Sequence, residues 1–474
     1  MLIGIDVGTT AVKAALFDGK GNVLRRFGER YPAARPAPGH VEQDPSCWTD
    51  LVTRALSVLA EGVDVAAVGL CSQVNTHVFV DANGKALAPA MTWQDTRCSG
   101  AAAEIDRQVA TGDKISWWGA PLPVDASHVL ARIAHVKRKD PDLWARTRYV
   151  MAPKDFCILH LTGEASADPM TNFGILDQHL SLIAPLLARV PGAEERLPPI
   201  SRFTHLVGRI RPGHPCAGVP VVTGAMDAWS GLLGAGVSED GQGLYLSGTS
   251  EILGILSHER LPVPGVIAFA ECEGMVLHAG PTQSGAASAD WLARILGRSA
   301  ADVASLAAQA DPAHVPLFLP HLDGERAPLW DPQARGAFTG LTSATGAPEL
   351  ALAVLEGVAY SARLVFDSLA QSAGREAEVI HHAGGGASSD LWCQIRADVL
   401  GKPLRRTAMR DAGVLGAALM AGVGVGVFGS LKEAVRDFVP FDAAFTPRAE
   451  TAGRHAARFG AYRVAYEQLR AVRG

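Results

Sequence analysis

Two short segments of the same design lie half a chain apart, and they constrain the fold more than any other feature. Ile3 to Thr10 is an apolar run that ends in Gly-Thr-Thr, and Gly243 to Ser250 is an apolar run that ends in Gly-Thr-Ser. A second apolar run follows each of them. Both segments therefore predict β-hairpins whose tight turns carry glycine and hydroxyl side chains. A repeated hairpin predicts two similar domains.

The length and charge of the chain agree with two domains that bind small molecules. The 474 residues, 48% of them apolar, exceed what one domain usually holds. We place a boundary near residues 237–241, which gives domains 1–237 and 238–474. The formal net charge of -5 offers no basic surface for nucleic acid. We therefore expect small-molecule ligands and no nucleic acid.

The cysteines and the apolar segments bear on the compartment. Seven cysteines are scattered without a C-x-x-C pair, which is typical of a reducing cytoplasm. No basic region or cleavage site precedes the first apolar run, so we expect no secretory signal. Residues 412–431 are uncharged, but six glycines and many alanines favour a closely packed helix over a membrane span.

Short apolar runs alternate with amphipathic stretches, which is typical of an α/β protein. The clearest predicted strands are Leu2 to Asp6, Ala66 to Leu70, Val219 to Thr223, Leu244 to Ser247 and Val379 to Ala383. A helix is predicted after Asp44, a natural N-cap, with Pro45 at its first position and apolar residues at helical spacing.

The glycine turns are candidates for binding polyphosphate. Glycine and threonine let backbone N-H groups and hydroxyls converge on phosphate oxygens, and each hairpin turn has both residues. Lys13 could add positive charge, and Asp6 could hold a magnesium ion directly or through water. A turn cap for Asp6 and a solvated charge for Lys13 are the alternatives. The candidate residues of the two turns are Gly8, Thr9, Thr10, Gly248 and Thr249, and Gly285 is a further nucleotide candidate.

A third glycine segment, Gly384-Gly385-Gly386-Ala387, lies between a predicted strand and a predicted helix. It would allow close backbone contact with a flat ligand and would aim a helix N-terminus at it. A tight strand-to-helix turn without a ligand is the alternative. The segment matches neither a Walker motif nor a dinucleotide fingerprint.

Polar residues near two other predicted strands are candidates for the reacting substrate. Asp227 follows the strand Val219 to Thr223, at the end where α/β sheets place ligands, and is the candidate base. Its alternative is an N-cap for the next helix. Trp93 and Asp95 suit a polyhydroxylated ligand, with a surface turn as the alternative. The segment Gln73-Val74-Asn75 could reach the same pocket.

With these motifs in order, the chain resembles the FGGY family of carbohydrate kinases over nearly its whole length. Landmarks of the resemblance are Glu42-Gln43-Asp44-Pro45, Trp93-Gln94-Asp95-Thr96-Arg97, Pro153-Lys154-Asp155, Gly324-Glu325-Arg326-Ala327-Pro328 and Gly384-Gly385-Gly386-Ala387. It implies two actin-like, ribonuclease-H-like domains with a central cleft that binds ATP and Mg²⁺. By position, Asp227 matches the general base and Asp6 the magnesium-associated aspartate of the family.

The resemblance implies phosphorylation of a hydroxyl on a small ketose or polyol, with D-xylulose as the first expectation. Xylulokinases have Gln-Met-His where this chain has Gln73-Val74-Asn75, and glycerol kinases have Gln-Arg-Glu. Ala228 after Asp227 is similar to ribulokinase-like members. Ribulose, erythritol and related acceptors therefore remain alternatives, and a homodimer is expected by analogy only. An actin-like ATP-binding switch is the rival from another class.

Overall fold

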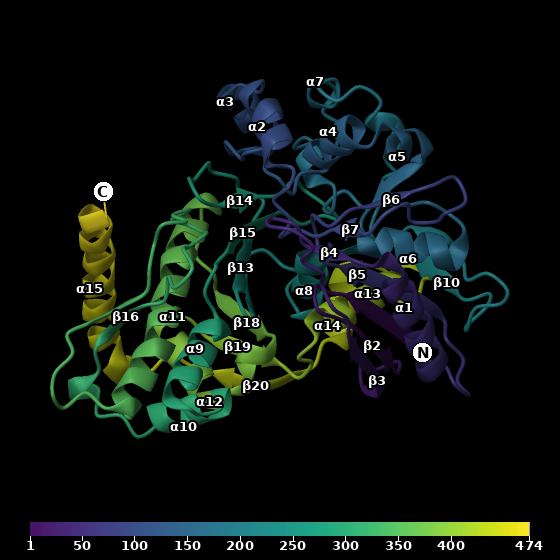
Figure 1. Cartoon of the computed structure of the whole chain (residues 1–474). Coiled ribbons are helices and arrows are strands. Elements are labelled where there is room, and N and C mark those ends of the chain that lie inside the picture. Colours follow the sequence, from purple (N-terminus) through teal and green to yellow (C-terminus); the bar gives the residue numbers. More distant parts are fainter. Residues whose placement is uncertain (474) are drawn as a thin grey trace. The chain divides into compact units, whose positions relative to one another are not determined.

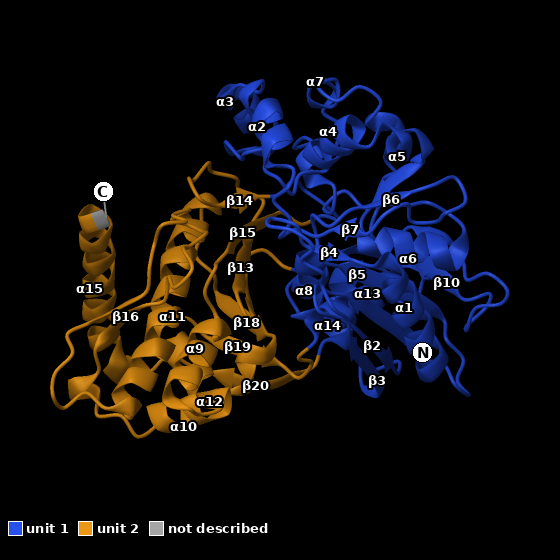
Figure 2. Ribbon diagram, in the orientation of Figure 1, with its two compact units in different colours: residues 1–238, 269–274, 411–439 blue, residues 239–268, 275–410, 440–474 orange. Residues whose placement is uncertain are grey.

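In a computed structural model that describes residues 1–473, the chain divides into two compact units (Figure 2). Unit 1 comprises residues 1–238, 269–274 and 411–439. Unit 2 comprises residues 239–268, 275–410 and 440–474. Each unit is built around a seven-stranded sheet with helices packed on it (Figure 1).

The two sheets have the same plan, as the repeated hairpin predicts. In unit 1 the hairpin β1–β2 is followed across the sheet by two strands parallel to β1 and then by an antiparallel edge strand. In unit 2 the hairpin β12–β13 is followed by β18 and β19 in parallel and by β20 antiparallel. The sheet of unit 1 runs β3 (Val23–Arg30), β2 (Ala11–Phe17), β1 (Leu2–Val7), β5 (Ala67–Ser72), β10 (Pro220–Val222), β9 (Leu206–Arg209), with β11 (Ala225–Met226) also paired to β5. The sheet of unit 2 runs β14 (Ile267–Ala268), β15 (Leu277–Pro281), β13 (Glu251–Leu256), β12 (Gln242–Ser247), β18 (Val379–Ala383), β19 (Leu404–Thr407), β20 (Phe441–Phe445).

The remaining elements form the layers around these sheets. In unit 1 the helices are α1 (Pro45–Leu59), α2 (Ser99–Arg107), α3 (Thr111–Trp118), α4 (Val129–Lys139), α5 (Pro141–Arg146), α6 (Pro153–Thr162), α7 (Ala184–Leu187), α8 (Asp227–Gly234), α13 (Ala412–Gly424) and α14 (Leu431–Phe438). In unit 2 they are α9 (Ala286–Leu296), α10 (Ala300–Ala307), α11 (Ala347–Ser372), α12 (Asp390–Leu400) and α15 (Ala449–Arg473). Three strand pairs complete the fold: β4 (Glu42–Gln43) with β7 (Ala90–Met91), β6 (Val78–Val80) with β8 (Tyr149–Met151), and β16 (Leu317–Leu319) with β17 (Ala337–Thr339).

The helix predicted after Asp44 is confirmed as α1. The Asp44 carboxylate accepts a hydrogen bond from Ser46 N at 2.9 Å, and Pro45 occupies the first turn, where its missing N-H costs nothing. The apolar residues of α1 are buried against the side of the sheet that carries Ile3 and Ile5. Every second residue of a strand points to one face, so the intervening Gly4 points to the other.

The glycine-rich segment 412–431 is confirmed as a tightly packed helix followed by a turn, because α13 lies against the face of the sheet opposite α1. A Cβ on Gly69 of β5 would come within 2.7 Å of the Ala417 carbonyl carbon, and a Cβ on Gly416 within 2.7 Å of the Ser230 carbonyl carbon. Only glycine permits such close backbone approach. No helix among residues 1–473 is long and apolar enough to cross a membrane.

Candidate active site

Three candidate residues of unit 1 lie at the carboxyl ends of neighbouring parallel strands. Asp6 is the penultimate residue of β1, Gln73 follows β5, and Asp227 follows β11, which pairs in parallel with β5. Gln73 N also donates to the Val7 carbonyl at 3.1 Å, so the two strand ends stay in register. This edge is where an open α/β sheet presents ligands.

Asp227, the candidate base, does not cap its helix. Met226 occupies the N-cap position of α8, and Asp227 is the first helical residue, whose Oδ1 accepts from the Ala228 N at 2.7 Å. Burial, and to a lesser extent the negative charge of Asp6, raises the pKa of Asp227 to about 7. A carboxylate with such a pKa can accept a proton near neutral pH.

Asp6 has an acceptor atom to spare. Its Oδ1 is buried without a hydrogen-bond partner among residues 1–473, an arrangement that suits a cation because an orphaned carboxylate oxygen is otherwise costly. Burial raises the pKa of Asp6 to about 6, although Lys13 acts to lower it. No group of three or more histidine, cysteine, aspartate or glutamate side chains in the described part of the chain forms a ready-made metal site.

Lys13 does not extend freely into solvent. Its Nζ lies 2.7 Å from Asp411 Oδ1, at the boundary between β19 and α13, and its side chain is 51% exposed. Asp411 was not a candidate in the sequence, because 398 residues separate the two partners. The charge of Lys13 is therefore paired with an acidic residue, and Lys13 also lies opposite Asp6 in the β1–β2 register.

A chain of amide hydrogen bonds connects the first glycine turn to the sugar-site candidates. Gln43 Nε2 donates to the Thr9 carbonyl at 2.6 Å, and Gln73 Nε2 donates to Gln43 Oε1 at 2.8 Å. Gln73 Oε1 stays buried and unpartnered within residues 1–473. Trp93 Nε1 donates to Thr9 Oγ1 at 3.2 Å, so the half-exposed indole lies beside the same turn. Gln43, a landmark of the family resemblance, thus links the Thr9 carbonyl to Gln73.

Both carboxylate oxygens of Asp95 are already hydrogen-bonded within the protein, which its sequence context did not indicate. Its Oδ2 accepts from Val41 N at 2.7 Å, and both of its oxygens accept from Arg97. Burial acts to raise the pKa of Asp95, but the Arg97 hydrogen bonds prevail and lower it. Asp95 is therefore an ionised anchor of this loop. Val74 and Asn75 follow Gln73, half-buried, with Asn75 in a left-handed conformation (φ 54°).

In unit 2 the nucleotide candidates come together at the ends of β12 and β18. Gly248 and Thr249 form the β12–β13 turn, and the N-terminus of α9 attaches to it: Ala286 N donates to the Gly248 carbonyl at 2.9 Å. A Cβ on Gly285 would lie 2.9 Å from that same carbonyl oxygen. Gly384, with φ of 98°, follows β18 and leads into the short helical turn Gly385–Ser388 before α12. Helix α12 ends at Leu400, and Gly401 follows it as a left-handed C-cap.

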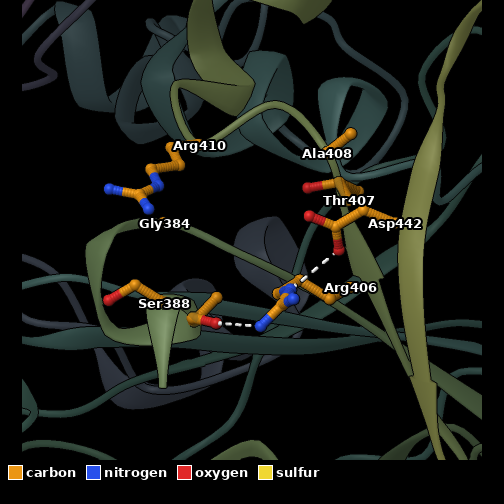
Figure 3. A pocket seen from close by; sticks show the side chains of 8 residues that line it. Gly384, Ser388, Arg406, Thr407, Ala408, Arg410 and Asp442 are labelled. Atoms are coloured by element: carbon orange, nitrogen blue, oxygen red, sulfur yellow. Dashed lines mark hydrogen bonds and ion pairs between the residues drawn. The ribbon is translucent and has the colours of Figure 1, made fainter. Parts of the chain in front are cut away.

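A pocket of unit 2 opens beside this glycine segment (Figure 3). It is lined by Gly384, Ala387, Ser388, Arg406, Thr407, Ala408, Arg410 and Asp442. Arg406 lies between its two sides, with Nη1 donating to the Ala387 carbonyl at 3.2 Å and Nε to Asp442 Oδ1 at 2.8 Å. Of the lining residues, only Gly384 and Ala387 were candidates from the sequence; Arg406 and Thr407 belong to β19 and Asp442 to β20, strands that folding brings alongside.

Family models for the two halves of a carbohydrate kinase match this chain. The N-terminal domain model of the FGGY family of carbohydrate kinases matches residues 1–234, and the C-terminal domain model matches residues 243–425. The xylulose kinase of Escherichia coli strain K12 is 31% identical to this chain over 99% of both sequences. The chain belongs to the FGGY family of carbohydrate kinases. It is therefore a sugar kinase, which agrees with the resemblance and not with an actin-like ATP-binding switch.

Other FGGY kinases extend the similarity in sequence and in structure. The glycerol kinase of Thermus brockianus is 32% identical over 96% of both chains. A crystal structure described as a xyloylose kinase from Brucella ovis has a TM-score of 0.88 at 28% identity and covers 99% of each chain. The gluconate kinase of Lactobacillus acidophilus, at 24% identity, shares the fold with a TM-score of 0.89. The predicted two-domain actin-like architecture is thus confirmed.

Proposed function

We propose that this FGGY kinase transfers the γ-phosphoryl group of ATP to a hydroxyl of D-xylulose and produces xylulose 5-phosphate. Support comes from the xylulose kinase of Escherichia coli, which matches this chain from end to end. Ribulose, erythritol and other pentuloses or polyols are the alternative acceptors. The Thermus brockianus glycerol kinase has a similar identity to this chain, so overall identity does not choose among acceptors.

Asp227 is the proposed catalytic residue, and its geometry carries the proposal. It lies at the carboxyl end of the sheet with a pKa near 7, and so it can orient the acceptor hydroxyl and take its proton as the phosphoryl group transfers. Because phosphoryl transfer passes through a loose transition state, orientation by Asp227 matters more than complete deprotonation of the hydroxyl.

We assign Mg²⁺ to the neighbourhood of Asp6, whose buried Oδ1 lacks a partner in the described chain. When bound there, the ion would neutralise charge on the phosphate oxygens. Replacing Asp6 with Asn should raise the Mg²⁺ concentration needed for half-maximal activity. An unchanged Mg²⁺ requirement would remove Asp6 from this role.

The other site residues are assigned either to sugar binding or to ATP binding. We propose domain 1–237 as the sugar-binding domain, in which Gln73, Val74, Asn75, Trp93 and Asp95 contact or shape the acceptor site. We propose domain 238–474 as the nucleotide-binding domain. The proposed ATP contacts are Gly8, Thr9, Thr10, Lys13, Gly248, Thr249, Gly285, Gly384, Gly385, Gly386 and Ala387. A cytoplasmic homodimer is part of the same proposal and rests on family analogy.

A coupled ADP-release assay tests the proposed acceptor. ATP and Mg²⁺ are supplied with D- or L-xylulose, D- or L-ribulose, erythritol, glycerol or gluconate, and one reaction receives no acceptor. We expect D-xylulose to give the highest kcat/KM and the no-sugar reaction to show only weak ATP hydrolysis. A higher kcat/KM with another acceptor would replace xylulose. ADP release that no acceptor increases would contradict the proposal.

A further inference from the structure

A buried ion pair of unit 2 lies beneath the segments proposed to bind nucleotide. Arg396 comes from α12 and Glu251 is the first residue of β13, and neither side chain has any exposed surface. Arg396 Nη2 lies 3.2 Å from Glu251 Oε1. The proposed reaction uses neither residue, so the presence of a charged pair in this core needs a reason.

The guanidinium of Arg396 bonds to both glycine segments. Its Nη1 donates to the Gly386 carbonyl at 2.8 Å, in the loop that follows β18. Its Nη2 donates to Ser247 Oγ at 2.9 Å, immediately before the Gly248–Thr249 turn. A Cβ on Gly386 would collide with the Ser247 side chain, so the two segments are in direct contact at this point. One planar group therefore sets the spacing between two loops that are distant in sequence.

Glu251 connects the pair to the third nucleotide candidate. A Cβ on Gly285 would lie 2.8 Å from Glu251 Cγ, so the Glu251 side chain packs against the start of α9. The backbone agrees, since Thr282 N donates to the Glu251 carbonyl at 2.9 Å and Glu251 N donates to Thr282 Oγ1 at 3.2 Å. The hairpin turn and the Gly285 segment are thus held by the same acidic residue.

The polar atoms of the pair are satisfied, which keeps the arrangement rigid. Arg396 Nε donates to the Tyr245 hydroxyl at 3.1 Å, and that hydroxyl donates to the Glu251 carboxylate at 3.0 Å. The Trp392 ring lies 4.0 Å from the Arg396 guanidinium carbon, so its π face covers the cation. A fully bonded guanidinium has one orientation, because its donors form a fixed planar fork.

A buried ion pair of this kind contributes little to stability, because the loss of hydration offsets the attraction between the charges. Apolar side chains of similar size would fill the same space about as well. They could not donate a hydrogen bond to the Gly386 carbonyl or fix its distance from Ser247. The pair therefore has a geometric role that packing alone does not supply.

We propose that Arg396, oriented by Glu251, is a positioning residue that holds the Gly248–Thr249 turn and the Gly384–Ala387 loop at the spacing at which both contact one ATP molecule. The inference rests on the proposed function, since it assigns these segments to the nucleotide. It concerns residues that do not themselves touch ATP. Its effect should appear in the binding of ATP and not in the binding of the sugar.

The test compares steady-state kinetics of Arg396→Met with those of the unchanged enzyme, at varied ATP and at varied sugar. We expect KM for ATP to rise by about tenfold or more, because small displacements of positioned groups weaken binding strongly. KM for the sugar should stay within about twofold. Equilibrium titration with ATP should show the same loss as the KM for ATP.

Further variants separate positioning from stability. Arg396→Met combined with Glu251→Met removes both charges, so Tm should recover while KM for ATP stays high. Glu251→Gln keeps an acceptor for Arg396 and should leave KM for ATP within about threefold. The matched control is Glu356→Gln, which breaks a second buried cluster of unit 2, where Glu356 pairs with Arg454 at 2.6 Å and Arg458 at 3.0 Å. It should lower Tm without changing KM for ATP.

Three results would overturn the inference. KM for ATP could stay unchanged in Arg396→Met, it could recover together with Tm in the double variant, or it could rise equally in Glu356→Gln. If Arg396→Met does not fold, the double variant decides the matter, and a KM for ATP equal to that of the unchanged enzyme would overturn the inference. Failure of the unchanged enzyme to bind ATP would instead contradict the proposed function, so the two failures are distinguishable.

Discussion

Asp6 and Asp227 lie at the carboxyl ends of two strands that both pair with β5, and the charge of Asp6 raises the pKa of Asp227. Burial is the larger cause of that shift. The arrangement favours the protonated form of Asp227 below about pH 7, whereas an unperturbed aspartate is ionised above pH 4. Both the stability and the activity of the enzyme should therefore depend on the protonation of Asp227.

The first prediction concerns stability against pH in the absence of ATP, Mg²⁺ and sugar. Because the folded-state pKa of Asp227 is raised, its favourable contribution is complete below the unfolded-state pKa and is lost as pH rises through about 7. Above pH 7 the folded protein holds a buried, ionised Asp227, which destabilises it, and Asp227→Asn removes that charge. The variant should therefore raise Tm more at pH 8 than at pH 5. An equal Tm shift at both pH values would contradict the assigned pKa.

The second prediction concerns the free acceptor atom of Gln73. Gln73 Nε2 is bound by Gln43, so Oε1 is left to accept a hydrogen bond from a sugar hydroxyl. Gln73→Leu should raise KM for the sugar by about tenfold or more and leave KM for ATP nearly unchanged. Gln108→Leu, at an exposed position after α2, is the control and should change neither constant. If Gln73→Leu behaves like the control, Gln73 does not contact the sugar.

The third prediction is that Lys13 contributes to ATP binding and little to stability. A half-exposed ion pair is worth at most about 1 kcal/mol, so Lys13→Met should change Tm little. If Lys13 contacts phosphate, the same variant should weaken ATP binding measured by equilibrium titration. Asp411→Asn provides the comparison, since it breaks the ion pair but retains the lysine. Equal losses of ATP affinity in both variants would show that the ion pair, and not the Lys13 charge, is what matters.

The fourth prediction concerns the close approach of α13 to its neighbours. A Cβ at Gly416 meets the backbone of Ser230 in α8, and backbone cannot move aside as a flexible side chain can. Gly416→Ala should cost about 1–3 kcal/mol and lower Tm. Gly453→Ala lies in the helix α15 with nothing within 4 Å of its added Cβ, and it should be neutral or stabilising. Equal Tm values for the two variants would refute this account of the packing.

Much of the fold could be predicted because local signals suffice for it. The apolar runs around Gly8 and Gly248 predict hairpins, and both are present. Asp44 and Pro45 predict the start of α1. The strand boundaries differ by one or two residues, as at Ala67–Ser72, because strand ends depend on neighbouring strands that a local pattern does not contain.

The parts that could not be predicted depend on long-range pairing. Residues 411–439 pack with unit 1, although unit 2 precedes and follows them in the chain. Asp411 thereby reaches Lys13, and no local pattern signals such a partner. The ion pair of Arg396 and Glu251 was also missed, because the partners are 145 residues apart and no local pattern connects them. The signal available in the sequence was a charged residue near each candidate glycine segment.

Phosphoryl transfer by Asp227→Asn tests the central claim most directly. ATP-dependent, sugar-dependent ADP release and ATP binding are measured together on this variant, with Asp50→Asn at an exposed position of α1 as the control. The account predicts that Asp227→Asn lowers kcat by about 100-fold or more while ATP still binds, and that the control is unaffected. Turnover of Asp227→Asn close to that of the control would contradict the assignment of Asp227 as the base.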